Sequence, residues 1–141
     1  MTLLRSLKIL FGLWLLIAVI ALGSTGLAMR SQLADDPKRV IIVVDSSFEA
    51  GKDWEFITAE LKRIGKDPYT RYKVLTEKTL AGEWQENALL DSVAPFAPRN
   101  WSEVISALPA MIGSCDEVLV LTNAQDLPAE FRQDGVKIIR P

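Results

Sequence analysis

One stretch decides the fold: Arg39-Val40-Ile41-Ile42-Val43-Val44-Asp45-Ser46-Ser47-Phe48-Glu49. A run of β-branched residues between polar residues predicts a strand that is buried on both faces. Strands of this kind lie at the centre of open α/β sheets, and ligands bind such sheets just beyond the carboxyl ends of the strands. Asp45, Ser47 and Glu49 are therefore the first candidate site residues.

The rest of the chain after Glu49 alternates between helix and strand patterns. Further strands are expected over residues 69–77, 80–84, 117–122 and 136–139. Helices are expected over residues 53–64, 85–93, 100–112 and 127–132. This alternation predicts one α/β domain of Rossmann type with a mostly parallel open sheet, covering residues 39–141.

The N-terminal part carries no charged residue between Lys8 and Arg30. As a helix, residues 9–29 would reach about 30 Å, the thickness of a bilayer core, so residues 1–30 are expected to be one transmembrane anchor. Positive charges precede the span and acidic residues follow it, which predicts a cytoplasmic N-terminus. The expected location is a bacterial inner membrane, crossed once, with a periplasmic domain joined through a polar linker at residues 31–38.

A cleaved signal peptide is the alternative to this anchor. It would use residues 9–22 as its apolar core and Gly26-Leu27-Ala28 as its cleavage site. The apolar character that continues to Met29 favours the anchor.

The composition excludes several classes of function. A net charge of −2 gives no basic surface for nucleic acid. The chain has no histidine, and it contains neither a Gly-x-Ser-x-Gly elbow nor a phosphate-binding loop, so common hydrolase and nucleotide-binding sites are not expected. Its one cysteine, Cys115, cannot form an intrachain disulfide.

Three segments carry a resemblance to a known family. Asp45-Ser46-Ser47-Phe48-Glu49 follows the first strand, Pro98-Arg99-Asn100-Trp101 precedes the third expected helix, and Leu121-Thr122-Asn123-Ala124 ends a later strand. In this order they resemble the three loops of a von Willebrand factor A domain. The resemblance covers residues 39–139 and implies a strand order of 3-2-1-4-5, with the strand before Asp45 at the centre.

In that family the three loops hold a magnesium ion that binds a partner's carboxylate. Carried over to this chain, Asp45 and Ser47 match, Glu49 replaces a serine, Asn100 stands near a threonine, and Asn123 replaces an aspartate. The resemblance thus implies a degenerate metal site at Asp45, Ser47, Glu49 and Asn123, which binds magnesium weakly or not at all because charged oxygens have been lost. The alternative is a hydrogen-bonded polar cluster in which Asn100 only caps its helix.

Protein recognition is the function that the resemblance implies. The chain is expected to be a non-enzymatic, membrane-anchored interaction module, an accessory or assembly subunit of a membrane or extracytoplasmic complex. The expected partner-binding residues are Phe48, Arg99, Asn100 and Trp101, since tryptophan is enriched in interface hot spots. A metal-dependent adhesion or ligand-binding receptor is the alternative. A hydrolase or transferase using Asp45 and Glu49 as a carboxylate pair is disfavoured, because no nucleophile or histidine accompanies them.

Overall fold

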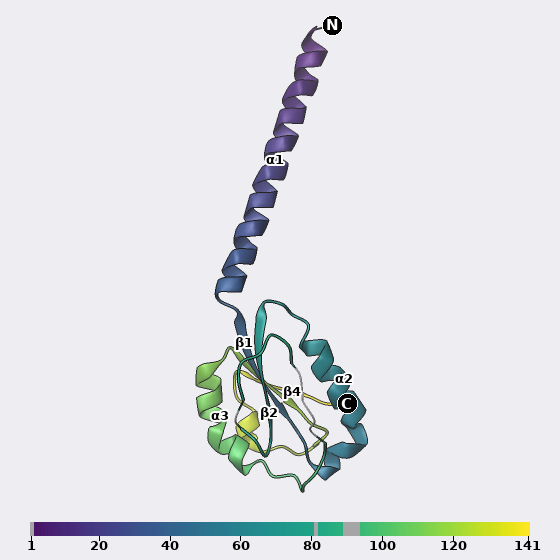
Figure 1. Ribbon diagram of the computed structural model, residues 1–141, viewed down its shortest axis with the longest axis vertical. Helices are drawn as coiled ribbons and strands as arrows, with labels where there is room; N and C mark the ends of the chain where they lie inside the picture. Colours follow the sequence, from purple (N-terminus) through teal and green to yellow (C-terminus); the bar gives the residue numbers. More distant parts are fainter. Residues whose placement is uncertain (1, 81, 89–93) are drawn as a thin grey trace. The chain divides into compact units, whose positions relative to one another are not determined.

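The structure is a computed structural model that describes residues 2–80, 82–88 and 94–141. It divides into two units, Met1–Asp36 and Pro37–Pro141 (Figure 1). The first unit is the helix α1, Thr2–Asp35, which is long and apolar enough to cross a membrane. The helix continues through residues 31–35, which were expected to belong to a polar linker. No helix-breaking residue occurs there before Pro37, so the non-helical connection is shorter than expected.

The second unit is built on a parallel sheet of four strands in the order β2-β1-β3-β4. The strands are β1 Lys38–Val44, β2 Thr70–Thr76, β3 Glu117–Leu121 and β4 Val136–Ile139. The expectation of an α/β fold with a mostly parallel sheet is confirmed. As expected, β1 lies inside the sheet, where Ile42 is in register with Val74 on one side and Leu119 on the other.

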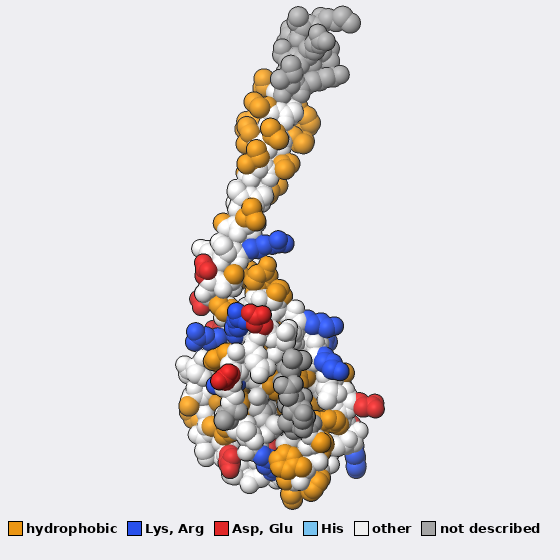
Figure 2. All heavy atoms as spheres, in the orientation of Figure 1, with side chains coloured by type: hydrophobic (Ala, Val, Ile, Leu, Met, Phe, Trp, Pro, Cys, Tyr) orange, Lys and Arg blue, Asp and Glu red, His pale blue; other side chains and the backbone are white. Residues whose placement is uncertain are grey.

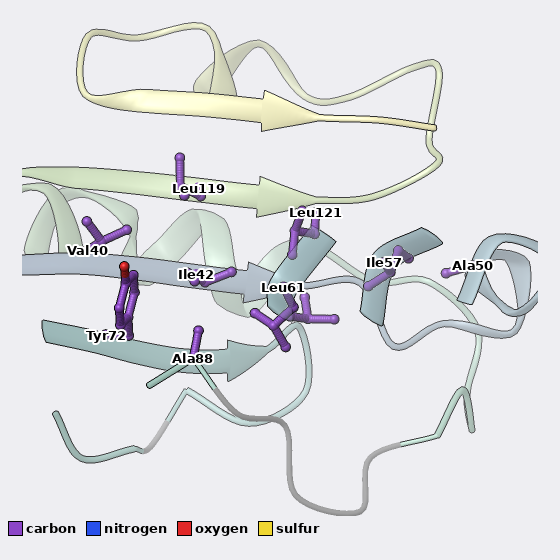
Figure 3. Close-up of a cluster of buried hydrophobic side chains, with 10 residues drawn as sticks. Val40, Ile42, Ala50, Ile57, Leu61, Tyr72, Ala88, Leu119 and Leu121 are labelled. Carbon is purple, nitrogen blue, oxygen red and sulfur yellow. The ribbon is translucent and has the colours of Figure 1, made fainter. Parts of the chain in front are cut away.

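Two helices cover the two faces of this sheet. The helix α2, Trp54–Ile64, packs against a cluster that includes Val40, Ile42 and Val44, part of which is drawn in Figure 3. The helix α3, Ser102–Ser114, packs on the opposite face, where Ile41 and Val43 are buried. Alternate residues of β1 therefore face different helices, which is why its run of apolar residues has no polar interruption.

Short 3-10 helices complete the unit. One of them, η1 (Phe48–Asp53), links the end of β1 to α2, and the other, η2 (Ala129–Phe131), precedes β4. The Ser47 hydroxyl accepts a hydrogen bond from the Ala50 backbone N–H and so caps η1. Gly65 follows α2, and a Cβ atom there would lie 2.6 Å from the Ala88 backbone nitrogen. Only glycine therefore allows the segment containing Ala88 to approach the end of α2.

The expected fifth strand, over residues 80–84, is not found among its described residues. The chain instead turns at the end of β2, where the Thr79 backbone N–H donates to the Thr76 carbonyl at 3.2 Å. It then meets β2 again at an antiparallel bridge between Tyr72 and Gln85. The described part of the helix expected over residues 85–93 is not helical either, and residues 89–93 lie outside the described part of the chain.

Candidate functional site

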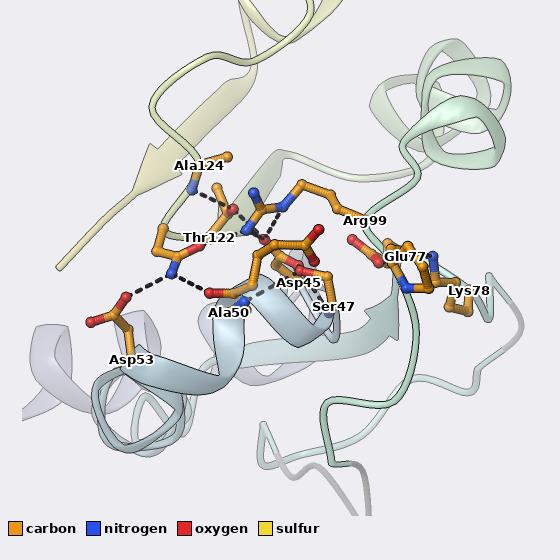
Figure 4. A network of polar contacts seen from close by, with 12 residues as sticks. Asp45, Ser47, Ala50, Asp53, Glu77, Lys78, Arg99, Thr122 and Ala124 are labelled. Carbon is orange, nitrogen blue, oxygen red and sulfur yellow. Dashed lines mark hydrogen bonds and ion pairs between the residues drawn. The ribbon is translucent and has the colours of Figure 1, made fainter.

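A row of polar side chains crosses the carboxyl end of the sheet. Leu75 of β2, Val43 of β1 and Val120 of β3 belong to one core cluster on the α3 face. Because side chains alternate along a strand, the residue two positions beyond each of them, namely Glu77, Asp45 and Thr122, continues on that face. The backbone pairing extends past the strands, since Glu77 N donates to Val44 O and Asp45 N donates to Leu121 O. Figure 4 shows the side chains that gather here.

Asp45 is buried at the centre of this row, and both of its carboxylate oxygens are fully used. Oδ1 accepts from the Ser47 backbone N–H at 3.1 Å and from the Ser47 hydroxyl at 2.5 Å. Oδ2 accepts from the Thr122 hydroxyl and from Arg99, whose Nε and Nη2 both lie 2.9 Å away. A buried carboxylate is costly without such partners, and here four groups satisfy it.

Asn123 joins three segments through its amide group. Its Oδ1 accepts from Arg99 Nη2 at 2.6 Å, and its Nδ2 donates to the Glu49 carbonyl at 2.7 Å and to the Asp53 carboxylate at 2.6 Å. An aspartate at this position could accept from Arg99 but could not make either donation. The asparagine is therefore the residue that the surrounding donors and acceptors require.

Burial alone would raise the pKa of Asp45. The hydrogen bonds from Ser47 and Thr122, together with the Arg99 charge, outweigh burial and hold the pKa of Asp45 below its usual value. The pKa of Glu49 is also lowered, first by its own backbone N–H and then by the Ser47 hydroxyl and by Arg99. Both carboxylates are therefore ionised at neutral pH.

Glu77 lies beside Asp45 in the row, in a very different environment. Its side chain is buried, and neither carboxylate oxygen accepts a hydrogen bond from the described residues. Lys78 Nζ lies 3.0 Å from Glu77 Oε1, close enough for an ion pair but not aligned as a hydrogen bond. Burial, and to a smaller extent the negative charge of Asp45, raises the pKa of Glu77 to about 7.

The residues expected to bind metal are grouped around Arg99. Ser47 donates directly to Asp45, whereas Asn123 is connected to Asp45 through Arg99. The hydroxyl of Ser47 and the charge of Arg99 also lower the pKa of Glu49. Within the part of the chain that the structure describes, no group of three or more His, Cys, Asp or Glu side chains is placed to hold a metal ion. In this arrangement the Arg99 guanidinium supplies the positive charge that Asp45 faces.

The residues expected to bind a partner are placed in different environments. Phe48 is 60% exposed, whereas the Trp101 side chain is buried and packs edge-on against Phe131, with ring centroids 5.4 Å apart. Arg99 is mostly enclosed by its bonds to Asp45 and Asn123. Trp101 and Arg99 thus hold the fold together here, whereas Phe48 and Asn100 are exposed.

Asn100 lies just before α3, where the capping interaction differs from the expected one. Its Oδ1 accepts from the Ser102 backbone N–H at 3.0 Å and from the Ser102 hydroxyl at 2.8 Å. The residue in the N-cap position is Trp101, whose side chain makes no capping bond. Asn100 therefore orders the turn that leads into α3, one residue before the N-cap position.

Three residues at the site were not identified as functional candidates from the sequence: Glu77, Thr122 and Phe96. Glu77 and Thr122 each end a correctly expected strand next to β1, so the strand order itself was a usable signal for them. No comparable signal exists for Phe96, because its position depends on a pairing between segments far apart in the sequence. The Phe48 N–H donates to the Ala97 carbonyl at 2.9 Å, and the Phe96 N–H donates to the Ser46 carbonyl at 3.1 Å.

Comparison with known proteins found no counterpart for this arrangement: no protein-family model, no curated protein and no solved structure matches the chain.

Proposed function

We propose that the chain is a membrane-anchored protein-interaction module, an accessory or assembly subunit of a membrane or extracytoplasmic complex, with no catalytic role of its own. The observation that carries this proposal is a pair of exposed aromatic side chains at the carboxyl end of the sheet. Phe48 and Phe96 are 60% and 54% exposed, although the unit has well-filled clusters on both faces of the sheet. Exposed aromatic residues on a rigid support are typical of protein interfaces.

The membrane part of the proposal rests on α1. Its candidate membrane span is Leu10–Asp35, and the length of this span suits one crossing of a bilayer. We propose an N-terminus in the cytoplasm and a second unit in the periplasm, on the charge asymmetry around the span. The order of the three loop motifs and the four-stranded parallel sheet support a likeness to von Willebrand factor A domains, a family built for recognition.

Photo-crosslinking in intact cells tests the recognition role. Benzoylphenylalanine placed at Phe96 is expected to give a specific adduct with a membrane or periplasmic protein. The same probe at Glu55, an exposed residue of α2, serves as the matched control and is expected to give no such adduct. An absence of any adduct at Phe96, or equal adducts at both positions, would contradict the proposal.

Protease accessibility tests the topology. Protease added to spheroplasts is expected to digest the second unit, while mass spectrometry of the membrane fraction finds the N-terminal peptide intact. A protected second unit, or a soluble form that begins near Met29, would contradict the proposed anchor and orientation.

A divalent-metal-dependent adhesion or ligand-binding receptor is the second candidate. The observation in its favour is that one hydrogen-bond network includes Asp45, Ser47 and Asn123, with Arg99 between Asp45 and Asn123. Against it, Arg99 and the hydroxyl groups already use both oxygens of Asp45, so a cation would have to displace Arg99. If the crosslink from Phe96 still forms after a chelator has removed divalent metal ions, this candidate is excluded.

A further inference from the structure

The two edge strands of the sheet differ in how the rest of the chain covers them. The outer side of β2 is partly covered, because Tyr72 and Gln85 exchange backbone hydrogen bonds of 2.8 and 2.7 Å. The opposite edge is formed by β4, which lies beside β3 (Figure 3). Among the described residues, no strand or bridge pairs with the outer side of β4. The sheet therefore has one partly covered edge and one open edge.

The backbone of β4 presents free hydrogen-bonding groups along this open edge. The Gly135 and Ile139 carbonyls face β3, from which they accept hydrogen bonds of 2.8 and 3.2 Å. Successive residues of a strand direct their backbone groups to alternate sides, so Val136 and Ile138 direct theirs away from β3. The Val136 N–H donates to the Gln133 carbonyl at 3.2 Å. The Val136 carbonyl and both backbone groups of Ile138 have no backbone partner within the described part of the chain.

The side chains of β4 leave the core incomplete at the same edge. Val118 and Val120 of β3 are fully buried, whereas their register partners on β4, Val136 and Ile138, are only partly buried in the same cluster on the α3 face. Ile139 is likewise partly buried at the cluster on the α2 face. A further strand beside β4 would cover these side chains as β4 covers those of β3.

We propose that the outer edge of β4 binds an extended segment of the partner protein, which adds a fifth strand to the sheet. This inference rests on the proposed interaction role and specifies the conformation of the partner. Backbone groups of the segment pair with those of Val136 and Ile138, and its apolar side chains continue the two core clusters. A helix would not suit this edge, because its backbone groups are already bonded to one another.

A second copy of the chain suits the edge less well. Two β4 strands related by a two-fold axis would run antiparallel, so the two β1 strands would begin at opposite ends of the joined sheet. Only Asp36 and Pro37 separate each β1 from its α1, and the seven residues of β1 span roughly 23 Å. Two such chains could enter one membrane only if the joined sheet lay flat against it. A segment of a different protein is free of this constraint.

Photo-crosslinking from Lys137 in intact cells tests the inference on the full-length chain. The Lys137 side chain is 72% exposed, and Glu117 keeps Lys38 as an ion-pair partner when Lys137 is replaced. Benzoylphenylalanine at Lys137 is expected to give an adduct with a membrane or extracytoplasmic protein, and mass spectrometry is expected to place the crosslink in a segment rich in β-branched and other apolar residues. The matched control is the same probe at Lys66, an exposed lysine before β2 at the opposite edge, where no such adduct is expected.

Two variants of Ile138 show whether the adduct depends on the open edge. Ile138→Pro removes the outward N–H and places the proline ring on the edge, without removing a donor that faces β3. We expect the adduct from Lys137 to fall about tenfold, because the backbone pairing is broken. Ile138→Val keeps both backbone groups and is expected to leave the yield unchanged. An absent adduct, equal adducts from Lys66, a yield that Ile138→Pro does not change, or an adduct with a second copy of the chain would overturn the inference.

Hydrogen exchange gives a readout that does not depend on the folding of the proline variant. In the purified full-length chain in mild detergent, the Ile138 amide is expected to exchange fast, whereas the Lys137 and Ile139 amides, which face β3, exchange slowly. In the crosslinked complex, exchange at Ile138 is expected to slow about tenfold or more. Protection of Ile138 in the free chain would show that the edge is already covered and would overturn the inference, as would an unchanged rate in the complex.

The crosslinks from Phe96 and Lys137 separate this inference from the interaction role itself. If Phe96 gives its adduct and Lys137 gives none, the interaction role stands and the added-strand inference fails. If neither position gives an adduct, both fail.

Discussion

Asp45 and Glu77 make an instructive pair, because they occupy equivalent places in the fold and behave in opposite ways. Each follows a strand of the same sheet, each points to the α3 face, and each is buried. Asp45 accepts hydrogen bonds from Ser47, Thr122 and Arg99, so its pKa falls. Glu77 accepts none from the described residues, and its pKa rises to about 7.

The difference shows that burial by itself does not determine the charge of a carboxyl group. Burial raises the pKa of both residues, and only the donors around Asp45 reverse that effect. The Asp45 half of the row is thus a closed ionic network, whereas the Glu77 half gains or loses a proton near neutral pH. The two halves are coupled, because the charge of Asp45 contributes to the raised pKa of Glu77.

The largest effect is expected from Asp45→Asn. The variant leaves the largely enclosed Arg99 guanidinium without its counter-ion. It also places an amide N–H₂ group opposite a hydrogen-bond donor, such as the Ser47 hydroxyl or Arg99. Breaking one side of a buried ion pair costs about 3–5 kcal/mol, so the free energy of unfolding should fall by that amount. Urea titration of the full chain in mild detergent, followed by tryptophan fluorescence, measures it. Asp126→Asn, at an exposed position, is the control, and equal stability of the two variants would contradict the closed network.

A pH-dependent effect is expected from Glu77→Gln. Because the pKa of Glu77 is raised from 4.5 to about 7 on folding, the folded state binds more protons between those values. Its stabilising contribution is therefore complete below about pH 4.5 and is lost as the pH rises through about 7. At 1.36 kcal/mol per pKa unit, the loss amounts to roughly 3 kcal/mol, and it should be absent from the Gln variant.

Asp45 does not interfere with that measurement. The pKa of Asp45 is lowered, so its contribution to stability is present above the ordinary carboxyl pKa of 3.8 and is lost only as the pH falls further. Denaturation curves at pH 5 and pH 8 for the wild type and for Glu77→Gln give the comparison. A wild-type stability that is the same at both pH values would show that Glu77 finds a donor in solution.

The smallest effect is expected from Asn123→Asp. The variant removes the two donations to the Glu49 carbonyl and to Asp53, and it places a like charge beside the Asp53 carboxylate. We expect a loss of about 1–3 kcal/mol, the cost of leaving buried or partly buried polar groups without partners. We also expect no gain in magnesium affinity, since Arg99 still occupies Asp45.

Titration calorimetry with magnesium checks the second part of that prediction on the full-length chain. The wild type is expected to bind magnesium weakly or not at all, because the amide of Asn123 supplies no charged oxygen and Arg99 already pairs with Asp45. A sub-millimolar affinity that Asp45→Ala abolishes and Asn123→Asp strengthens would establish a working metal site and overturn the assignment of Arg99 as the resident cation.

The sequence by itself determined the elements that depend on local pattern. The apolar run before Asp45 predicted β1 and its central position, the helical spacing after Asp53 predicted α2, and the uncharged N-terminal run predicted α1. Hydrophobic periodicity and segment length are properties of short segments, so they can be read from the local sequence without knowledge of the rest of the chain. The residues grouped at the carboxyl end of the sheet also followed in part, because parallel strands end at one edge.

Only the tertiary structure decided what those grouped residues do. Trp101 lies in the core, where Phe131, thirty residues later, packs against it, and the backbone at Phe96 is held by the bridge between Ser47 and Ala97, two residues far apart in the sequence. Likewise, Arg99 reaches Asp45 and Asn123 from a third segment, and Glu77 receives no donor from any described neighbour. Burial and hydrogen bonding at these positions depend on contacts with residues that are distant in the sequence. The local sequence around each residue therefore does not predict them.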